Sequence, residues 1–472
     1  MPNLVFKPKD VYSVMNTLVH TVTGQTSISV VDTSSFIDAG KTILDYGYDA
    51  LYEAMGVLID KTVIAIRGYD GKFRLINAND DEFGERFRKI SYYSQDALAS
   101  GEFNTDVYTN LGAGLNDGSG VGSQWEQFPS MPVEKMFRSS AAYDKGHTHY
   151  IEQAKQAFGG DPGAFLDYIN GEMISFQNDI NVTLEARNRS LVLDRIAGTK
   201  LLADKGDIGP ECAVNMTKFF NDAHGTSYTT AQLLNDHTVA FWECFLAKFK
   251  NDSDMLTNLT ALYHDPLTKQ VGGNYYKVLR HTPKEMQRFI FNSRLFTQFK
   301  IDLAEIFNPQ MLALPDGEGV QFWESVTDPY KVQIKPALPE GAKSSNVKID
   351  TVIGLLFDRD ALISNNRFDG VYATPINARH GYVNTFHHYL FGFYNDYSEN
   401  GILYYMSDDS TEYFEGDGTE DDFTITGTVN NIVSVTVNDV AKTAGTDYTY
   451  SSNVVTFTTA PADGAIIAVT YN

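Results

Sequence analysis

The sequence has few of the features of secreted and membrane proteins. It contains only two cysteines, Cys212 and Cys244, which belong to no Cys-x-x-Cys motif and provide no disulfide framework. No apolar run approaches the length of a membrane span, and the first ten residues, MPNLVFKPKD, lack the apolar stretch of a signal peptide. These absences predict a chain that works in water, in a reducing compartment, with no membrane partner.

Basic residues are scarce relative to acidic ones. The 472 residues include 37 Lys and Arg against 60 Asp and Glu, which leaves a formal net charge of −23. A charge of this sign opposes long-range attraction to DNA and to anionic lipid. The length leaves room for two or three domains with cores of their own. We therefore expect a folded, multidomain protein that does not bind nucleic acid through long-range electrostatic attraction.

Motifs for phosphate or metal binding are missing as well. No Gly-x-x-x-x-Gly-Lys-Ser/Thr motif occurs, and the glycine-rich tract 111–125 has neither the lysine nor the strand-to-helix context of a phosphate site. The close histidine pairs are His147 with His149 and His387 with His388. Neither pair makes a metal site without remote ligands, so we interpret them as surface or core residues.

The remaining reactive side chains also suit a structural role. Cys244 lies among Trp242 and Phe245 on a predicted helix, which indicates a core position and not a nucleophile. The carboxylates at 80–82 and 420–422 lack the alternating ligand spacing of a calcium loop. We assign no catalytic, cofactor-binding or metal-binding residue and predict a protein that is not an enzyme and needs no cofactor.

The longest predicted element is a helix over residues 161–198. Asp161 is a suitable N-cap, Pro162 suits the first helical position, and Gly198 suits a left-handed C-terminal residue. At 1.5 Å per residue such a helix is a rod of roughly 50 Å. Apolar residues recur along it at helical spacing, at Phe165, Ile169, Met173, Phe176, Ile180, Leu184 and Leu191.

Before this helix, residues 1–58 mix short helical patterns with extended, polar sequence and predict an arm without a core of its own. A β-rich excursion follows, and the glycine-rich tract 111–125 forms a loop within it. The strands expected in this excursion are 62–67, 72–77, 86–93 and 133–139.

After the long helix, the pattern predicts helices at 215–223 and 229–248. Thr282-Pro283-Lys284-Glu285 has the form of a capping box and predicts a third helix that carries Met286, Phe289 and Leu295. The apolar run in 347–357 predicts a strand buried on both faces, and 382–406 is strand-like.

An acidic, turn-rich stretch at 407–422 predicts a linker to a new domain. Short strands parted by turn residues follow it, with the spacing of a small β-sandwich. The predicted strands are 423–426, 432–437, 447–450, 454–458 and 465–471.

The order of arm, β excursion, long helix, mixed α/β region and closing strands resembles the HK97-fold major capsid proteins of tailed bacteriophages. The resemblance covers about residues 1–410 and contributes no catalytic motif. Its most specific residues are LLFDRDAL (355–362), TPIN (374–377), GYVNTFHH (381–388) and YND (394–396), supported by GQT (24–26), DTSSF (32–36), 187–198 and FNP (307–309).

The resemblance implies an α+β, HK97-like capsid fold with a small C-terminal β-sandwich. The arm starts at Met1, without the cleavable helical region of some family members, so a scaffolding protein is expected to be separate or absent. The implied parts are an N-terminal arm (1–60), an extended loop lying on a neighbouring subunit (61–139), a peripheral domain with a spine helix (140–200), an axial domain (201–379), a return to the peripheral domain (380–410) and a C-terminal immunoglobulin-like β domain (411–472).

The implied function is that of a structural protein of the virion. Hexamers and pentamers, assembled in the host bacterial cytoplasm, would form an icosahedral shell that encloses double-stranded DNA without binding it specifically. The expected partners are further copies of the chain, a scaffolding protein, the portal and a decoration protein. The C-terminal domain, with eight acidic side chains and one lysine from Tyr413 onward, is expected on the outer surface and to be dispensable for the shell.

Two other classes stay open. An encapsulin-type compartment shares the fold implied by the resemblance. A carbohydrate-binding fibre or adhesin is suggested by the C-terminal β domain, which resembles modules that recur in phage tail fibres, and by the many aromatic residues.

Overall fold

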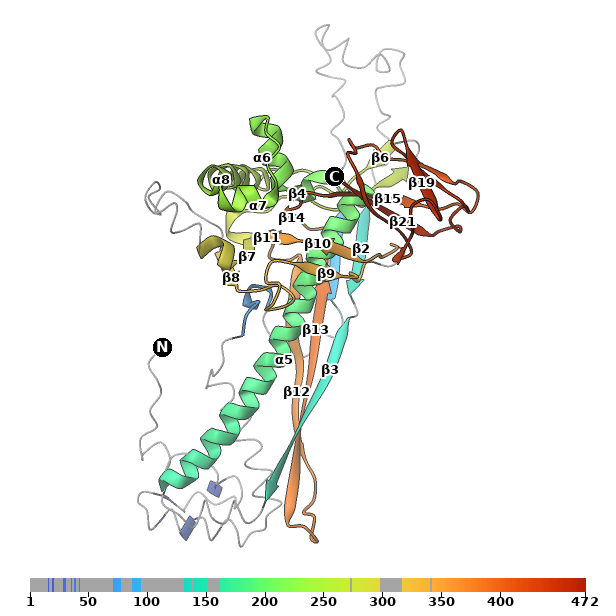
Figure 1. Cartoon of the computed structure of the whole chain (residues 1–472). Helices are drawn as coiled ribbons and strands as arrows, with labels where there is room; N and C mark the ends of the chain where they lie inside the picture. Colours follow the sequence, from blue (N-terminus) through green and yellow to red (C-terminus); the bar gives the residue numbers. More distant parts are fainter. Residues whose placement is uncertain are drawn as a thin grey trace, which may run out of the picture. The chain divides into compact units, whose positions relative to one another are not determined.

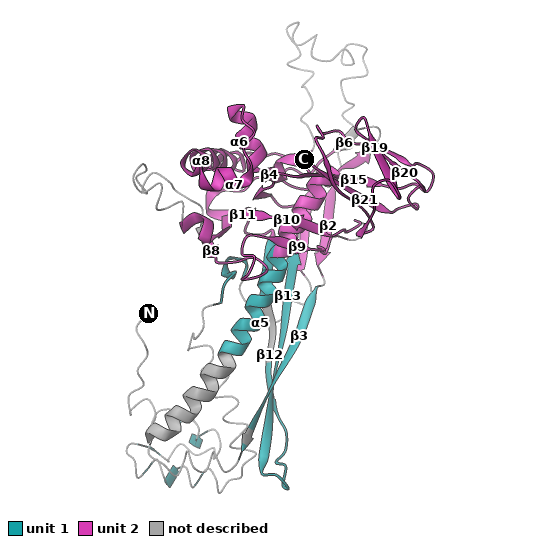
Figure 2. Ribbon diagram, viewed as in Figure 1, with its two compact units in different colours: residues 1–86, 138–192, 362–394 teal, residues 87–137, 193–361, 395–472 magenta. Residues whose placement is uncertain are grey.

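A computed structural model of the chain describes residues 71–77, 87–94, 131–137, 139–150, 162–271, 274–297, 316–339 and 342–472, together with isolated positions between 16 and 42. Most of the predicted arm, the predicted strand 62–67 and the glycine-rich tract 111–125 lie outside the described residues. Figure 2 shows two compact units: unit 1 comprises residues 1–86, 138–192 and 362–394, and unit 2 comprises residues 87–137, 193–361 and 395–472.

The centre of unit 2 is a five-stranded sheet of order β4-β14-β11-β7-β8 (Figure 1). All eight residues of its middle strand, β11 (Thr351–Asp358), are buried, as the apolar run predicts. β14 (Gly401–Met406) and β7 (Gln287–Asn292) pair antiparallel with β11. β4 (Ala213–Asn215) and β8 (Asp316–Val320) pair parallel with β14 and β7.

Three helices cover one face of this sheet: α6 (Met216–His224), α7 (Thr230–Asn235) and α8 (Thr238–Met255). Aromatic side chains of α8 and alternate residues of β14 belong to one buried cluster, in which the Phe245 and Tyr404 ring centroids are 5.4 Å apart. The predicted helix 215–223 is confirmed. The predicted helix 229–248 is divided into α7 and α8, because the chain between them contains residues of low helix propensity.

The other face of the sheet meets the last turns of α5 (Pro162–Lys205), where the Lys200 ammonium lies 5.1 Å from the ring centroid of Tyr405. We call residues 193–361 and 395–406 the body of unit 2. Its short elements are η3 (Pro210–Cys212), β5 (Lys269–Val271), β6 (Asn274–Tyr276), η4 (Lys284–Met286), β9 (Val332–Ile334) and β10 (Val347–Ile349).

Unit 1 contains a three-stranded sheet of order β12-β13-β3 and the first part of α5. Alternate residues of β13 are buried, and Tyr389 and Phe391 on it pack against Ile180 and Leu184 of α5, two of the predicted inward positions. The remaining described elements are β12 (Leu362–Ala373), β13 (Tyr382–Asn395), β3 (Ser140–Tyr150) and η1 (Arg74–Ile76).

The long helix is confirmed, but Gly198 does not end it. A β-carbon at Gly198 would clash with the Tyr397 hydroxyl, so this glycine permits a close approach inside the helix. The helix ends about two turns later at Lys205, and Gly206, with φ of 79°, is the left-handed residue that terminates it. None of the described helices is long and apolar enough to cross a membrane.

Two local predictions before and after this helix are wrong. The capping-box sequence at 282–285 yields only the single turn η4, and β7 follows it because its aromatic and β-branched residues pair with β11. The Thr282 hydroxyl donates to Asp358 Oδ2 (2.7 Å) instead of capping a helix. The predicted strand 72–77 contains η1 at its centre in place of a strand, and β3 was not predicted at all.

The C-terminal module, residues 410–472, has two sheets that share a buried apolar cluster. All five predicted strands are present. The predicted linker 407–422 is wrong in its middle, because β15 pairs with β21 along its whole length. The strands are β15 (Ser410–Glu415), β16 (Asp422–Thr424), β17 (Ile432–Val437), β18 (Val440–Ala441), β19 (Tyr448–Ser451), β20 (Val454–Phe457) and β21 (Ile466–Tyr471).

Candidate functional site

The candidate site is an ionic cluster that fastens a strand pair to the body of unit 2. β1 (Phe87–Tyr92) and β2 (Pro132–Phe137) pair antiparallel, and Lys89 lies directly opposite Lys135. The two predicted strands at 86–93 and 133–139 are thereby confirmed. Like charges placed opposite each other repel, so this register requires a shared anion on the inner face of the pair.

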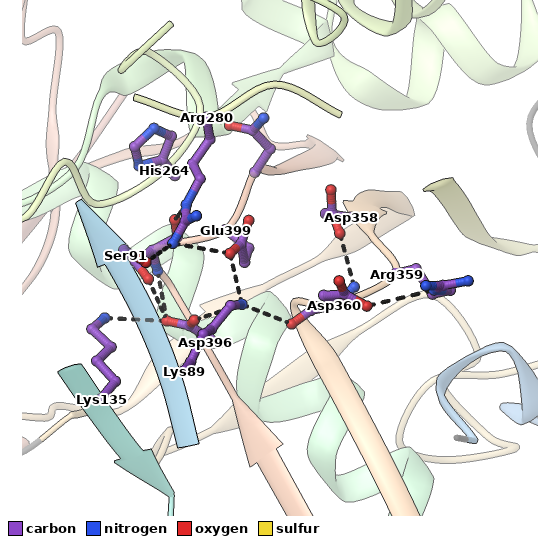
Figure 3. Close-up of polar contacts among 12 residues, drawn as sticks. Lys89, Ser91, Lys135, His264, Arg280, Asp358, Arg359, Asp360, Asp396 and Glu399 are labelled. Atoms are coloured by element: carbon purple, nitrogen blue, oxygen red, sulfur yellow. Dashed lines mark hydrogen bonds and ion pairs between the residues drawn. The ribbon is translucent and has the colours of Figure 1, made fainter. Parts of the chain in front are cut away.

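Asp396 provides that anion (Figure 3). Lys89 Nζ lies 3.0 Å from Asp396 Oδ2, and Lys135 Nζ lies 3.1 Å from Asp396 Oδ1. The Asp396 side chain has no exposed surface. The Ser398 hydroxyl also donates to Oδ1 (2.7 Å), so both carboxylate oxygens have donors.

A second carboxylate extends the cluster. Glu399 Oε1 lies 2.6 Å from Lys89 Nζ and 3.1 Å from Arg280 Nη2. The same Arg280 nitrogen donates to the Ser91 hydroxyl of β1 (2.5 Å). The strand pair is therefore held by three cationic side chains that share two buried or nearly buried carboxylates.

The pKa values of Asp396 and Glu399 are shifted in opposite directions. Burial raises the pKa of Asp396, but Lys89, Lys135 and the Ser398 hydroxyl outweigh burial and hold it far below its ordinary value. For Glu399 burial is the larger effect, so its pKa stays above the ordinary value despite Lys89 and Arg280. At neutral pH the Asp396 carboxylate is the firmly charged centre of the site.

Arg195 of α5 holds the same chain segment from within the body. Its guanidinium donates to the Asp396 carbonyl (2.7 Å), the Glu399 carbonyl (3.0 Å) and Asn395 Oδ1 (3.2 Å). It is fully buried, and burial lowers its pKa. Lys89 and Lys135 thus bind carboxylates of the segment 395–399, while Arg195 binds two of its backbone carbonyls and the Asn395 side chain. These contacts make the segment a rigid support for β1 and β2.

The opposite face of the strand pair is exposed and largely apolar. Ile90 is 48% exposed, Tyr92 61% and Met136 51%, which is unusual for three large apolar side chains on one face. An exposed ion pair, Arg88 with Glu134 (2.6 Å), lies on this face too. The strand pair therefore presents an anchored face and a free apolar face.

The four histidines singled out in the sequence lie on the paired strands β3 and β13. His387 of β13 is buried, and burial together with His147 and His388 lowers its pKa to about 4, so it is neutral at pH 7. The side chain of His149 lies outside the described residues. Among the described residues, no group of three or more His, Cys, Asp or Glu side chains is placed to hold a metal ion.

The cysteines and acidic runs behave as structural residues where the structure describes them. Burial raises the pKa of Cys212 to about 12, which keeps it a thiol. Cys244 is half-buried and packs against the aromatic cluster, as expected of a core residue. Residues 420–422 are exposed, and 80–82 lie outside the described residues.

The ionic cluster itself was missed from the sequence. Its signal was present, because alternation along β1 places Lys89 on the inner face with Phe87 and Ser91, where a lysine requires a buried partner. The partner could not be named, since Asp396 is 307 residues away from Lys89.

No protein-family model matches the chain, and no curated protein matches it either. Solved structures that resemble it include the capsid structure of Staphylococcus phage Andhra (TM-score 0.47, 12% identity, 72% of this chain and 86% of that chain). Others are the capsid structure of the cyanophage P-SCSP1u (0.40, 10%, 72% and 90%) and the head structure of Helicobacter pylori bacteriophage KHP40 (0.34, 11%, 72% and 93%). Because each TM-score lies below 0.5, the assignment of a function has to come from this chain's own residues and elements.

Proposed function

We propose that the protein is the major capsid protein of a tailed bacteriophage, with an HK97-like fold and an immunoglobulin-like C-terminal module. Its copies assemble through hexamers and pentamers into an icosahedral shell around double-stranded DNA. The C-terminal module lies on the outer surface of the virion. The partners are copies of the chain, with a scaffolding protein, portal and decoration protein as further candidates, and the chain itself carries out no catalysis.

The observation that carries the proposal is the place of the most specific motif in the fold. LLFDRDAL contains the end of β11, the following turn and the start of β12, so it lies where the chain passes from unit 2 into unit 1. The resemblance assigns this motif, together with TPIN, GYVNTFHH and YND, to the end of the axial domain and the return to the peripheral domain. The motif and the topology therefore support the same family by separate routes.

The free face of β1 and β2 supports assembly. A strand pair that is locked by buried charges on one face and exposes Ile90, Tyr92 and Met136 on the other suits a surface that a neighbouring subunit covers. The residues between the two strands belong to the predicted extended loop. The fibre or adhesin hypothesis, by contrast, rests on the C-terminal module and the aromatic content, and it leaves this face unexplained.

The proposal is tested by expressing the chain alone and together with the proteins encoded beside its gene, with particles measured by sedimentation and electron microscopy. We expect closed shells or capsomers of five and six copies. A variant with Ile90→Thr and Met136→Thr should fold as the wild type does by circular dichroism but assemble poorly. The matched control is Val440→Thr, an exposed valine of the C-terminal module (61% exposed), which should assemble normally.

Two results would contradict the proposal. One is a chain that stays monomeric at high concentration under every condition of co-expression. The other is equal assembly of the strand-pair variant and the control, which would remove the role given to the free face.

A further inference from the structure

The C-terminal module is attached to the body by more than its chain connection. Asp439 stands at the tip of the turn between β17 and β18, where it and Asn438 adopt left-handed backbone angles (φ 67° and 49°). This turn directs a carboxylate away from the module. Asp439 is therefore positioned to bind a partner outside its own two sheets.

The partner is the body segment 335–346. Asp439 Oδ1 accepts hydrogen bonds from the Ser345 hydroxyl (2.6 Å) and from the Asn346 backbone N–H (2.7 Å), and Lys335 Nζ lies 3.0 Å from Oδ2. Burial raises the pKa of Asp439, but these three donors outweigh it and the net pKa is below the ordinary value. The Asp439 carboxylate is thus charged, and both of its oxygens contact the body.

A second set of contacts is made by Lys343 of the same segment. Lys343 Nζ pairs with Glu415 of β15 and donates to the Gly464 carbonyl (3.0 Å), so it bridges two parts of the module. Lys205, the last residue of α5, donates to the Lys343 carbonyl (2.5 Å). We call the contacts of Asp439 and Glu415 with the body the clasp.

Beneath the module, the last turns of α5 carry a buried ion pair. Lys200 and Asp204 are bonded to each other one turn apart, and their side chains are only 10% and 16% exposed. Lys200 interacts with Tyr405 of the body and Tyr413 of the module, and burial, followed by the charge of Asp204, raises the pKa of Tyr413. Leu202 and Lys205 of the same turns line one cavity with Phe414 and Ile466 of the module, so the module lies over the end of the helix that carries this pair.

The seam between module and body is incompletely packed. A cavity of about 740 Å³ lies beside the clasp, lined by Tyr397, Lys205 and Pro339 of the body and by Phe414 and Ile466 of the module. A dry apolar seam would resist opening, whereas a hollow seam held by partly exposed ion pairs loses little when it opens.

We propose that the C-terminal module is a releasable cover, held on the body by the clasp at Asp439 and Glu415, and that weakening the clasp uncovers the last turns of α5. Two states follow: a docked state with Lys200 protected, and a released state in which both the module and the body keep their folds.

The test is lysine modification of the full-length chain with an amine-reactive acetylating reagent, read by mass spectrometry. Lys200 reports on the cover. Lys248 is the internal reference, because it forms the same kind of i,i+4 pair with Asp252 and is 11% exposed, but it lies on α8, with its ammonium 5.6 Å from the ring centroid of Phe219. The variant is Asp439→Asn, and its control is Asp421→Asn, an exposed carboxylate with no hydrogen bond or ion pair from its side chain among the described residues.

We expect Asp439→Asn to raise the modification rate of Lys200 roughly two- to fivefold, the range for loss of a partly exposed ion pair, with Lys248 unchanged. Sodium chloride at about 1 M should raise the Lys200 rate of the wild type in the same direction, because salt screens the clasp. Asp421→Asn should change neither lysine.

Unchanged Lys200 modification in Asp439→Asn, at low and at high salt, would overturn the proposal. So would a parallel rise at Lys248, since that means unfolding of the chain and not release of a cover.

Discussion

Asp396 and Asp439 each accept hydrogen bonds from a serine and pair with lysine, and each joins segments that are far apart in the chain. Asp396 has no exposed side-chain surface and pairs with two lysines, whereas the Asp439 side chain is 24% exposed and pairs with one. The first joins the strand pair β1–β2 to the body, and the second joins the C-terminal module to the body.

The difference in burial between Asp396 and Asp439 decides whether each contact can open reversibly. A charge interaction strengthens as the local dielectric falls, and a buried carboxylate that loses its partners cannot be rescued by water. A partly exposed pair is solvated in both of its states, so its formation is nearly balanced. The same side chains therefore make a permanent anchor at Asp396 and a reversible contact at Asp439.

The largest effect expected from this comparison belongs to Asp396→Ala. The substitution leaves Lys89 and Lys135 opposite each other without the shared anion, and it should lower the free energy of unfolding by about 3–5 kcal/mol. Urea unfolding followed by circular dichroism measures it. The matched control is Asp179→Ala, which removes the exposed pair with Lys145 (2.6 Å, 52% and 45% exposed) and should cost about 0–1 kcal/mol. Equal losses in the two variants would remove the distinction between buried and exposed pairs.

The second prediction concerns the pH dependence of the anchor. The pKa of Asp396 is lower in the folded chain than its value near 3.9 in an unfolded one, so its contribution is complete above about pH 4 and is lost as the pH falls further. Asp396→Asn lacks this contribution. The stability gap between wild type and Asp396→Asn should be about 2–3 kcal/mol at pH 7 and should narrow below pH 4.

Urea unfolding at pH 7, 5 and 3 measures that gap. Glu399 titrates in the opposite sense, because its raised pKa makes the folded state take up a proton more readily. Comparing the two proteins at each pH cancels this shared term. A gap that stays constant down to pH 3 would show that Asp396 is not the charged centre of the cluster.

The sequence was sufficient where local pattern and tertiary packing agree. β11 was predicted because all of its residues are buried, which gives a continuous apolar run. The strands of the C-terminal module were predicted because alternate residues face a core, which gives an alternating pattern. The long helix was predicted from its spacing and its N-terminal residues.

The sequence misled where a local signal had two physical meanings. A glycine can end a helix or admit a neighbouring side chain, and Gly198 admits Tyr397 while Gly206 ends α5. A capping box is also only a preference, and pairing with β11 turned 287–292 into a strand. An acidic composition likewise concealed β15, whose Phe414 packs against the core of the module.

Only the lysines of the ionic cluster could be predicted from the sequence, and their carboxylate partner could not. Inward lysines on β1 and β2 signal that a buried anion exists, because an unpaired ammonium would be costly there. The identity of that anion depends on long-range topology, since Lys135 and Asp396 are 261 residues apart. No local pattern carries that information.

A third experiment disturbs the buried anchor without altering any charge. Gly198→Ala places a methyl group against the Tyr397 hydroxyl, next to Asp396 in the chain, and should cost about 1–3 kcal/mol through overpacking. The double variant with Tyr397→Phe removes the clashing oxygen, at the loss of its hydrogen bond to the Asp194 carbonyl (3.0 Å). The double variant should therefore be destabilised by less than the sum of the two single variants. Additive losses would mean that α5 accommodates the methyl group elsewhere.

The smallest effect is expected at the exposed side of the clasp. Lys335 is 58% exposed and supplies one of the three donors to Asp439, so Lys335→Ala should lower the free energy of unfolding by no more than about 1 kcal/mol. Ser345 and Asn346 still bind the carboxylate in this variant, and for that reason its Lys200 modification should rise less than in Asp439→Asn.

Lys348→Ala is the matched control for this variant. Lys348 is 55% exposed and pairs with Asp350 (2.9 Å) inside the body, so its removal takes away a similar ion pair without touching the module. Both variants should unfold at nearly the same urea concentration in 1 M salt, where surface pairs are screened. In low salt only Lys335→Ala should increase the modification of Lys200. If Lys348→Ala increases it equally, the exposure of Lys200 follows the overall stability of the body, and the attachment at Asp439 would not be the reversible contact that the comparison requires.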